Sequence, residues 1–576
     1  MSNKVIIQEF PYNQTGLQQL RDNAQKDGHD NRYLYQYPTV YIINDKSKNG
    51  KNQYAVYIGE TNNIAKRTTQ HLIDDPKSRN DWNSLSKSKT AQIYVIAHKH
   101  FNKSLTLDIE NQLMLHLGTV DNVIKIYNRR TNQQGEYYPV EELDSIFNAI
   151  WTKLHKKNKE LFPALSTIRD LAIFKSSPFH KLKQEQLIAR NVVMEKIDTA
   201  LENEETGQLI MITGEAGSGK TVLLSSIFND LLQDDRNIDV HLMVNHDEQV
   251  KVYQTIAKKL SFDSSRVTKP TVFINNASHP VDVVLVDEAH LLWTQGKQSY
   301  RGKNQLQDLL KLARVVVIIF DKNQILRTQQ ILEADDITKL ENQARKNDNL
   351  IELKNQMRID ADKHTINWIR SIVDKQTVGT LKTNSTRYEV KIFDTPQALE
   401  SAIRLKNKQD ADSNYANGIS RIIATFDWKF SSASKPKDDE LWMVKIDDWK
   451  LPWNNQIKHK KHHNINYKDL SWAEKPETIN EVGSTYTVQG FDLNYAGVII
   501  GPSVKYRDGH IVFDKNEHAN KDANQKRTLA DGSKQSFAEE LIKNELNVLL
   551  TRGVHGLYIY AVDPELRAVL KKAVQN

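Results

Sequence analysis

The sequence contains no cysteine. This absence excludes disulfide bonds and cysteine-ligated zinc, and it fits a reducing compartment. The sequence also lacks any run of about 18 consecutive apolar residues, the length that a membrane-spanning helix needs. Its first residues, MSNKVIIQEF, show neither the charged start nor the cleavage site of a signal peptide. We therefore expect a cytoplasmic protein with no membrane partner.

A strong excess of one charge is missing too. The 79 basic residues nearly balance the 72 acidic ones, which leaves a formal net charge of +7. Such a charge permits binding to a polyanion but does not require it. A chain of 576 residues is too long for a single hydrophobic core. Its length favours roughly three or four domains.

One glycine-rich stretch has the full pattern G-x-x-x-x-G-K-[ST] and lies between two apolar runs, Leu209–Ile212 and Val222–Leu224. This order predicts a strand, a phosphate-binding loop and a helix. The glycines let backbone N–H groups crowd around a polyphosphate, the lysine reaches the β- and γ-phosphates, and the hydroxyl ligates Mg²⁺. The alternative is a glycine-rich turn without a ligand. We expect ATP to be held by Gly214, Gly217, Gly219, Lys220 and Thr221.

A second, acidic element follows downstream, where the apolar strand Val281–Val286 ends in Asp287 and Glu288. Carboxylates at the carboxyl end of a buried parallel strand suit NTP hydrolysis with Mg²⁺ or Mn²⁺. We expect Asp287 to hold the metal ion through water and Glu288 to orient the attacking water. The alternative is a surface loop that follows a core strand.

The N-terminal part predicts a small mixed sheet with helices. Two β-branched runs, Thr39–Ile43 and Tyr54–Gly59, flank a polar turn and predict an antiparallel hairpin. The polar stretch that follows predicts a helix with Arg67 and His71 on one face. A third strand and a further helix, which carries Glu110, are expected at Ala91–Ala97 and Leu105–Leu117.

Over roughly residues 35 to 135 the sequence resembles the GIY-YIG nucleases. The signature pair reads Val40-Tyr41 and Tyr57-Ile58-Gly59, with Thr39 in place of the first glycine. The resemblance implies hydrolysis of a phosphodiester with one divalent metal ion held by Glu110. It also implies that Tyr41 and Tyr57 orient or deprotonate the attacking water, that Arg67 stabilises charge on phosphorus, that Asn128 holds the active-site backbone or the substrate, and that His71 is an extra member. Taken singly, each of these side chains is explained as well by packing or by surface exposure.

Four later stretches resemble, in order, the motifs of superfamily 1 helicases, particularly the group whose ATPase is shared with the Schlafen proteins. They are Arg314–Gln324, Leu353–Arg358, Gly483–Asp492 and Leu546–Arg552. The resemblance covers about residues 180 to 570. It implies a γ-phosphate sensor, arginine fingers from a second RecA-like lobe, and a coupling of nucleotide to the nucleic-acid track. By this resemblance Gln324 would be the sensor, Arg358 and Arg552 the arginine fingers, and Gln489 with Gly490 the coupling pair. Gln186 stands where such helicases keep an adenine-reading glutamine.

A tryptophan-rich region resembles no motif. It holds Trp428, Trp442, Trp449, Trp453 and Trp472, together with the basic run Lys458–His463. Aromatic and cationic side chains in alternation could stack on and clamp a nucleic-acid strand. Tryptophan is more often a core residue, and the histidines His459, His462 and His463 fit a solvated turn better than a metal site.

The predicted fold class is α/β. A small mixed α/β nuclease domain with a connecting helix is expected at 1–160, followed by a linker at 161–180. Two RecA-like P-loop lobes with parallel sheets are expected at 181–350 and 351–576, and the second lobe has a tryptophan-rich insertion near 426–472. We expect an ATP-dependent nucleic-acid motor fused to a metal-dependent endonuclease that cleaves DNA, a pairing that suits defence against phage or foreign DNA. One alternative is an ATPase that senses nucleotide and regulates the nuclease without translocating, and another is a nucleic-acid scaffold with an inactive nuclease. A homo-oligomer or a protein partner is compatible with the sequence.

Overall fold

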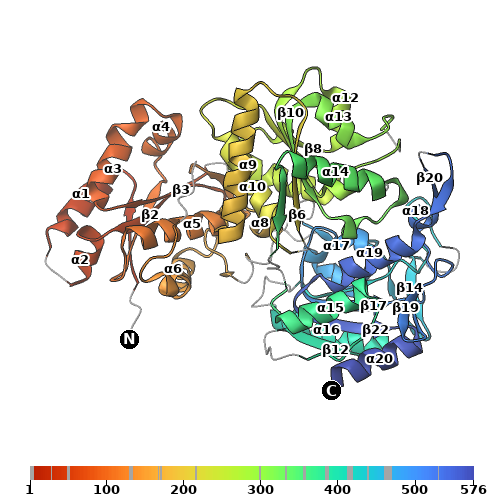
Figure 1. Cartoon of the computed structure of the whole chain (residues 1–576). Helices are drawn as coiled ribbons and strands as arrows, with labels where there is room; N and C mark the ends of the chain where they lie inside the picture. Colours follow the sequence, from red (N-terminus) through yellow and green to blue (C-terminus); the bar gives the residue numbers. More distant parts are fainter. Residues whose placement is uncertain are drawn as a thin grey trace. The chain divides into compact units, whose positions relative to one another are not determined.

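The structure is a computed structural model that describes residues 5–26, 29–47, 52–128, 134–165, 168, 172–214, 217–296, 300–330, 334–354, 359–382, 388–410, 419–436, 440–458, 470–529 and 531–575. Contacts divide the chain into two compact units. Unit 1 comprises residues 1–184, 225–237 and 252–266, and unit 2 comprises residues 185–224, 238–251 and 267–576. Figure 1 labels the elements of both units.

Unit 1 is built on a five-stranded sheet with the order β1-β4-β2-β3-β5. Its strands are β1 (Ile6–Pro11), β2 (Thr39–Lys46), β3 (Tyr54–Thr61), β4 (Gln92–Ala97) and β5 (Val123–Ile126). Its helices are α1 (Gln14–Ala24), α2 (His29–Tyr35), α3 (Ile64–Ile73), α4 (Asn80–Ser86), α5 (Lys103–Thr119), α6 (Leu143–Lys157) and α8 (Ala172–Lys175). Strands β2 and β3 pair in antiparallel fashion, so the predicted hairpin is confirmed.

Both faces of this sheet are covered, because successive side chains of a strand point to opposite sides. From β2, Val40 and Ile42 join a core that includes α5 and α6. Tyr41 and Ile43 join a second core with side chains from α1 to α4. The alternation therefore directs Tyr41 toward the face that carries α3, on which Arg67 and His71 lie.

Unit 2 contains two parallel sheets, each forming one lobe. Lobe 1 has the strand order β11-β6-β10-β9-β7-β8, and lobe 2 has the order β12-β22-β17-β13-β16. The first sheet consists of β6 (Gln208–Gly214), β7 (Val240–Val244), β8 (Val267–Thr268), β9 (Val281–Asp287), β10 (Ala313–Phe320) and β11 (Leu350–Leu353). The second consists of β12 (Glu389–Ile392), β13 (Arg421–Ala424), β16 (Val482–Gly483), β17 (Leu493–Ile500) and β22 (Gly553–Ala561). The prediction of an α/β fold with parallel sheets is confirmed.

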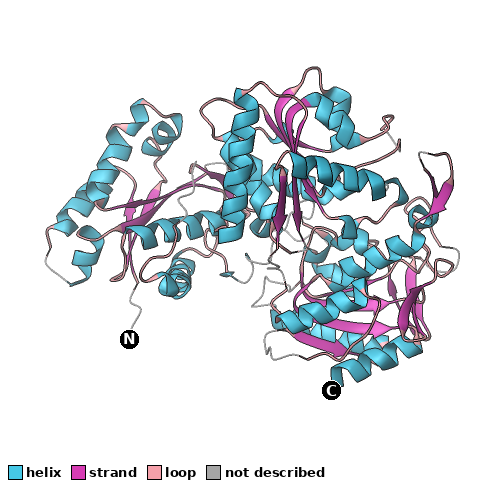
Figure 2. Ribbon diagram, viewed as in Figure 1, coloured by secondary structure: helices cyan, strands magenta, loops and turns pink. Residues whose placement is uncertain are grey.

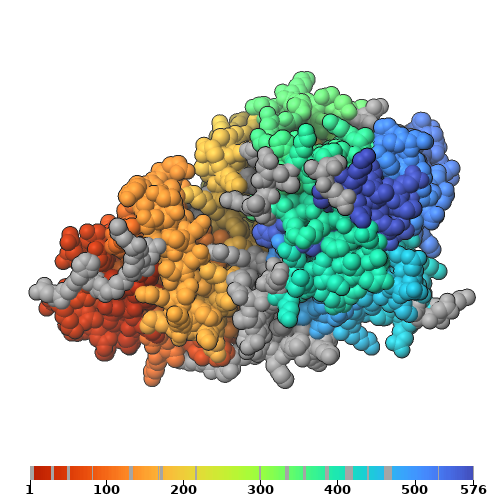
Figure 3. Space-filling model, turned by 90° about the horizontal axis from the view of Figure 1, so that it is seen from below, coloured from red at the N-terminus to blue at the C-terminus, as the bar shows by residue number. Residues whose placement is uncertain are grey.

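Helices flank both sheets of unit 2 (Figure 2). They are α9 (Gln184–Glu202), α10 (Lys220–Leu232), α11 (Asp247–Lys259), α12 (Pro270–Asn276), α13 (Gln305–Leu312), α14 (Ala334–Lys346), α15 (Lys363–Asp374), α16 (Pro396–Asp410), α17 (Thr485–Val488), α18 (Lys521–Asn524), α19 (Ala538–Leu550) and α20 (Pro564–Gln575). Lobe 2 also carries three hairpins, formed by β14 (Met443–Ile446) with β15 (Trp449–Pro452), β18 (Val504–Arg507) with β19 (His510–Phe513), and β20 (Lys526–Thr528) with β21 (Lys534–Ser536). On the face shown in the space-filling view, residues near 400 of lobe 2 form a broad teal area (Figure 3).

The later turns of α10 and α11 group with unit 1, which the sequence did not predict. Ser225 Oγ donates a hydrogen bond to the carbonyl of Ser176 at 2.8 Å, and Lys259 Nζ donates to the carbonyl of Val120 at 2.9 Å. The predicted domain boundaries stay predictions. In the described part of the chain, no helix is long and apolar enough to span a membrane.

Candidate active sites

The phosphate loop lies between β6 and α10, at the carboxyl end of a central strand. Gly217 and Gly219 have φ values of +88° and +77°, a region that glycine adopts without the steric cost of a Cβ. The side chain of Lys220 is buried, and its Nζ donates a hydrogen bond to the carbonyl of Gly214 at 2.7 Å. Thr221 occupies the second position of α10. Positive φ values at these two glycines fit a loop whose backbone N–H groups can turn toward a phosphate.

Strands β6, β10 and β9 are adjacent in this order and parallel, so the carboxyl ends of β6 and β9 lie at the same edge of the sheet. Asp287 and Glu288, at the carboxyl end of β9, therefore lie at the edge that carries the phosphate loop. Both side chains are buried. Glu288 adopts the left-handed conformation, with φ 50° and ψ 49°. A glutamate rarely adopts this conformation, and such local strain is concentrated at functional sites. The two carboxylates and the phosphate loop thus lie at one edge of the sheet of lobe 1.

Gln324 follows β10 of lobe 1 and is contacted by Arg552 of lobe 2. Gln324 Nε2 donates to Asp321 Oδ2 at 2.7 Å, and Lys220 Nζ lies 3.9 Å from the same oxygen. Arg552, which is fully buried, donates from Nη2 to Gln324 Oε1 at 3.0 Å. The structure therefore brings together a predicted sensor and a predicted arginine finger that are 228 residues apart in the sequence. The second predicted finger, Arg358, lies outside the described residues.

The predicted coupling pair also contacts lobe 1. Gln489 Nε2 donates to the carbonyl of Gln324 at 3.1 Å and lies 3.2 Å from His290 Nε2. Gly490 has φ +83°, and a Cβ there would lie 2.0 Å from Gln249 Nε2, so no larger residue fits without rearrangement. At the other side of the loop, Gln186 Nε2 donates to the carbonyl of Gly219 at 3.1 Å.

His290 is a site residue that sequence reasoning missed. Its Nε2 lies 3.2 Å from Glu288 Oε2, and the ring is buried. Burial lowers the pKa of His290, although Glu288 acts in the opposite direction. Burial therefore favours the neutral imidazole, whose Nε2 lies near both the Glu288 carboxylate and the Gln489 amide. The sequence signal that could have identified His290 was its position two residues after Glu288.

The two signature tyrosines of unit 1 lie on one face of the hairpin. Tyr41 pairs with Gly59 and Ile43 pairs with Tyr57, so the tyrosines are diagonal neighbours with ring centroids 6.1 Å apart. A Cβ on Gly59 would lie 2.4 Å from Tyr41 Oη, which explains the glycine. Burial raises the pKa of both tyrosines, and the Arg67 guanidinium lowers both through its charge and hydrogen bonding.

Glu110 lies on α5, with three charged neighbours in its electrostatic environment. Burial, assisted by the negative charge of Glu60, raises the pKa of Glu110 to about 8, while Lys103 and Arg67 act in the opposite direction. Glu60 directly follows the signature glycine and forms an ion pair with Lys103. Glu60 and Lys103 were both missed by sequence reasoning. Among the described residues, no group of three or more His, Asp or Glu side chains is arranged around a metal position.

The residues present fit a hard divalent cation that keeps several water ligands. Mg²⁺ is usually bound through one or two carboxylates together with substrate phosphates. Glu110 with nearby Glu60 in unit 1, and Asp287 with the Thr221 hydroxyl in unit 2, supply oxygen donors of this kind. A cation at either site does not need all of its ligands to come from the protein.

Both the oxygen and the nitrogen of the Asn128 side-chain amide form hydrogen bonds with the backbone of Ile58 in β3. Its Oδ1 accepts from the N–H of Ile58 at 2.9 Å, and its Nδ2 donates to the carbonyl of Ile58 at 2.6 Å. These two bonds hold the strand between Tyr57 and Gly59. The contact corresponds to the backbone-holding alternative for this residue.

His71 lies within a buried cluster that includes two residues the sequence did not single out. Its Nε2 lies 2.8 Å from Tyr41 Oη, and its Nδ1 lies 2.5 Å from Asp75 Oδ2. The imidazole stacks on Trp82 with ring centroids 3.7 Å apart. Asp75 follows His71 by four residues but lies beyond the end of α3, so the spacing alone did not indicate that the two side chains meet.

The tryptophan-rich region is mainly a packing region. Trp449, Trp453 and Trp472 are buried, and Trp472 Nε1 donates to Glu481 Oε1 at 2.6 Å. Stacking of a nucleic-acid base on these three rings is therefore excluded, and the core role that the sequence favoured is confirmed for them. Most of the basic run, with His459, His462 and His463, lies outside the described residues.

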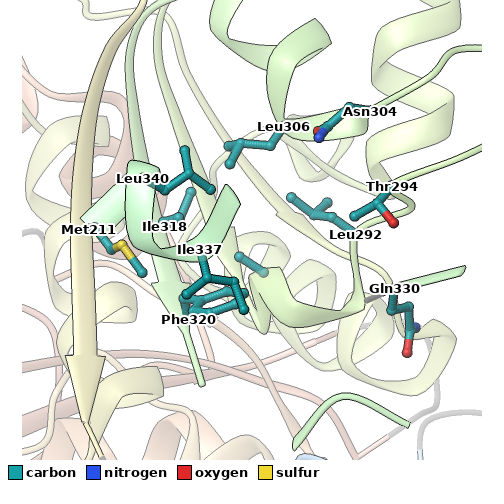
Figure 4. A pocket seen from close by; sticks show the side chains of 11 residues that line it. Met211, Leu292, Thr294, Asn304, Leu306, Ile318, Phe320, Gln330, Ile337 and Leu340 are labelled. Atoms are coloured by element: carbon teal, nitrogen blue, oxygen red, sulfur yellow. The ribbon is translucent and has the colours of Figure 1, made fainter. Parts of the chain in front are cut away.

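A small apolar cavity in lobe 1 is not a nucleotide site. Its volume is about 20 Å³, room for about one water molecule. Figure 4 shows the side chains that line it, among them Met211 of β6, Ile318 of β10 and Leu340 of α14. The cavity is too small to hold a nucleotide.

Comparisons with known proteins identify a domain family for each of two parts of the chain. Residues 207–563 match the family described as Schlafen group 3, DNA/RNA helicase domain. Residues 37–122 match the GIY-YIG catalytic domain. An uncharacterized protein of Saccharomyces cerevisiae is 32% identical over 403 residues, which cover 62% of this chain and 83% of that protein.

A solved structure of Pif1 helicases, described as the basis for DNA unwinding at forked dsDNA, is also similar. The match covers 66% of this chain and 92% of that one, with 12% identity and a TM-score of 0.27. This score is too low to establish a shared arrangement of the two chains.

The two matched domains imply an ATPase and helicase activity together with an endonuclease activity, which supports a nucleic-acid motor joined to a nuclease. The helicase match alone covers more than half of the chain. The chain therefore belongs to the Schlafen group 3 DNA/RNA helicase family and carries a GIY-YIG catalytic domain ahead of its helicase domain.

Proposed function

We propose that the chain is a superfamily 1 motor that hydrolyses ATP with Mg²⁺ and delivers DNA to its own nuclease domain. The observation that best supports the motor is the hydrogen bond between Arg552 of lobe 2 and Gln324 of lobe 1. An arginine in this place acts on charge that develops at the γ-phosphate during hydrolysis. A side chain that reaches the sensor from the other lobe links lobe movement to the state of the nucleotide.

In the ATP site, each proposed role follows from position. Lys220 and the backbone N–H groups of the loop bind the phosphates, and Gln186, which donates to the carbonyl of Gly219, reads the base. Glu288 orients the attacking water, with His290 as its buried neighbour. Gln489 connects this carboxylate region to lobe 2. A divalent ion, when bound at Thr221 and Asp287, neutralises charge on the β- and γ-phosphates.

In the nuclease site, Tyr57 and Tyr41 orient the attacking water and receive its proton. Arg67, which faces both phenols, stabilises negative charge on the phosphate in the transition state. Asn128 keeps β3 in place through Ile58. Glu110 is the residue that would hold a divalent cation, which supplies Lewis-acid chemistry at the scissile phosphate when bound.

We further propose that the biological role is defence against phage or foreign DNA, because a motor fused to an endonuclease suits the destruction of long invading duplexes. The alternative is a switch in which the ATPase regulates the nuclease without translocating. A motor predicts displacement of one strand from a duplex with ATP, whereas a switch predicts ATP-dependent cutting without displacement.

The experiment that separates these functions uses the full-length chain with a duplex that carries a single-stranded tail and two different fluorophores. Strand displacement, cutting and phosphate release are followed together, with and without ATP and Mg²⁺. Matched RNA substrates test the choice of DNA. Displacement in the Glu110→Ala variant, which should not cut, would support the motor. Cutting that needs ATP while no strand is displaced would reject it in favour of the switch.

A further inference from the structure

Asp75 lies in the turn after α3 and links two residues of the nuclease site, His71 and Arg67. Its Oδ2 lies 2.5 Å from His71 Nδ1, and its Oδ1 accepts a hydrogen bond from Gln70 Nε2 at 3.3 Å. Gln70 Oε1 in turn accepts from Arg67 Nη1 at 2.7 Å. One carboxylate therefore contacts, directly or through Gln70, both the imidazole and the guanidinium that face the tyrosines.

The groups that face the two nitrogens of His71, a carboxylate at Nδ1 and a hydroxyl at Nε2, fix its tautomer. A carboxylate can only accept, so Nδ1 must carry the proton that is shared with Asp75. In the neutral ring Nε2 then has a free lone pair, and the Tyr41 hydroxyl 2.8 Å away donates to it. The ring cannot rotate freely, because it stacks on Trp82 with an interplanar angle of 12°.

The charges around His71 favour its neutral form in the resting site. Burial lowers the pKa of His71 to about 4, and Arg67 and Arg79 act in the same direction. Asp75 is the group that raises it, through its charge and its hydrogen bond. Asp75 is therefore the group that makes the buried imidazole more basic.

Exposure increases along this chain of groups. Tyr41 and His71 are each only 1% exposed, whereas the side chain of Asp75 is 21% exposed. The carboxylate is thus the member of the chain that reaches solvent. It offers a route by which a proton accepted inside the site can leave.

We propose that Asp75 is a positioning residue of the nuclease site, which lets His71 accept the proton that the attacking water gives up through Tyr41. This inference rests on the proposed nuclease function. As the water oxygen bonds to phosphorus, one O–H bond of the water breaks and its proton passes to Tyr41 Oη. The proton of Tyr41 moves to His71 Nε2, the P–O bond to the leaving oxygen breaks, and that oxygen takes a proton from solvent. Asp75 stabilises the imidazolium and then releases the extra proton to solvent.

The test is a double-mutant cycle in the full-length chain. Asp75→Asn keeps the size of the side chain but removes its charge, and it should lower kcat for cutting by about 100-fold, the lower end of what a positioned proton acceptor contributes. KM for the nucleic acid and the ATP turnover should not change. In a His71→Gln background, Asp75→Asn should cause no further loss, because residues that act as one unit are not additive.

Asp74→Asn is the matched control, since it removes the same charge one residue earlier from a side chain that is 64% exposed. It should cut like the wild type. Asp75→Glu, which keeps the charge, should retain more activity than Asp75→Asn, and thermal unfolding checks that each variant folds.

Three results would overturn the role of Asp75: wild-type cutting by Asp75→Asn, equal losses from Asp75→Asn with and without His71, or an equal loss in Asp74→Asn. Undiminished cutting by Glu110→Ala would instead reject the nuclease site itself. The two failures are therefore distinguishable.

Discussion

Glu288 is a site residue whose backbone adopts a conformation that its side chain disfavours. It holds the left-handed conformation next to the buried Asp287, and its N–H donates to Asp287 Oδ1 at 3.0 Å. This bond orients the Asp287 carboxylate, and the contact with His290 orients that of Glu288. The strain is consistent with a water-orienting role in ATP hydrolysis.

Two substitutions separate binding from chemistry at this site. Lys220→Ala removes the cation that neutralises the phosphates, so ATP affinity should fall together with turnover. Glu288→Gln should keep ATP affinity and lower kcat by about 10²- to 10⁴-fold, because it removes only the group that accepts the proton of water. Binding of a fluorescent ATP analogue and phosphate release measure the two effects. Normal turnover in either variant would contradict the assignment.

The raised pKa of Glu110 gives a pH dependence whose sign can be worked out. Its pKa in the folded state is about 8, above the ordinary value of 4.5. Between these two values the unfolded chain has lost the proton that the folded chain keeps, so this group lowers the free energy of unfolding as pH rises. Without divalent cations, Glu110→Gln should therefore become increasingly more stable than the wild type from about pH 5 to pH 8. Urea unfolding in EDTA at several pH values tests this, and a constant difference would contradict it.

At the scale of elements, the β2–β3 hairpin sets the geometry of the nuclease site. Tyr41 lies over Gly59 across the pair, at a distance that leaves no room for a side chain. Gly59→Ala should therefore displace Tyr41 and destabilise the domain by about 1–3 kcal/mol, the usual cost of overpacking a core. Gly135→Ala, at a position with no atoms within 4 Å of the added Cβ, is the control. Equal unfolding midpoints in urea for Gly59→Ala and wild type would contradict this packing.

The elements also explain what sequence could and could not predict. The phosphate loop, the β9 carboxylates and the hairpin were predictable, because their residues are close in sequence and follow the period of a strand or the pattern of a loop. The contact of Arg552 with Gln324 and the pairing of Asn128 with Ile58 span 228 and 70 residues. The family resemblance named these residues, but only the fold places them in contact. Asp75 was missed because its significance depends on the rotamer of His71, which sequence spacing alone does not determine.

At the scale of the whole molecule, each activity has its own core. Tyr41, Arg67 and Glu110 belong to unit 1, and the described residues of the ATP site belong to unit 2. Helix α10 begins with Lys220 in unit 2, and from Ser225 its residues group with unit 1. The two activities should therefore be separable by point substitutions but linked in their use of long substrates.

The central claim, that an ATP-driven motor supplies substrate to the nuclease, is tested most directly by a two-by-two comparison. Glu110→Ala and Glu288→Gln are each assayed with ATP and Mg²⁺ on a long duplex and on a short single strand, beside the wild type. Glu110→Ala should lose cutting of both substrates by orders of magnitude and keep the ATP turnover that nucleic acid stimulates. Glu288→Gln should lose cutting of the long duplex far more than of the short strand. Equal cutting by Glu288→Gln and wild type on both substrates would contradict the claim, and would leave two independent activities in one chain.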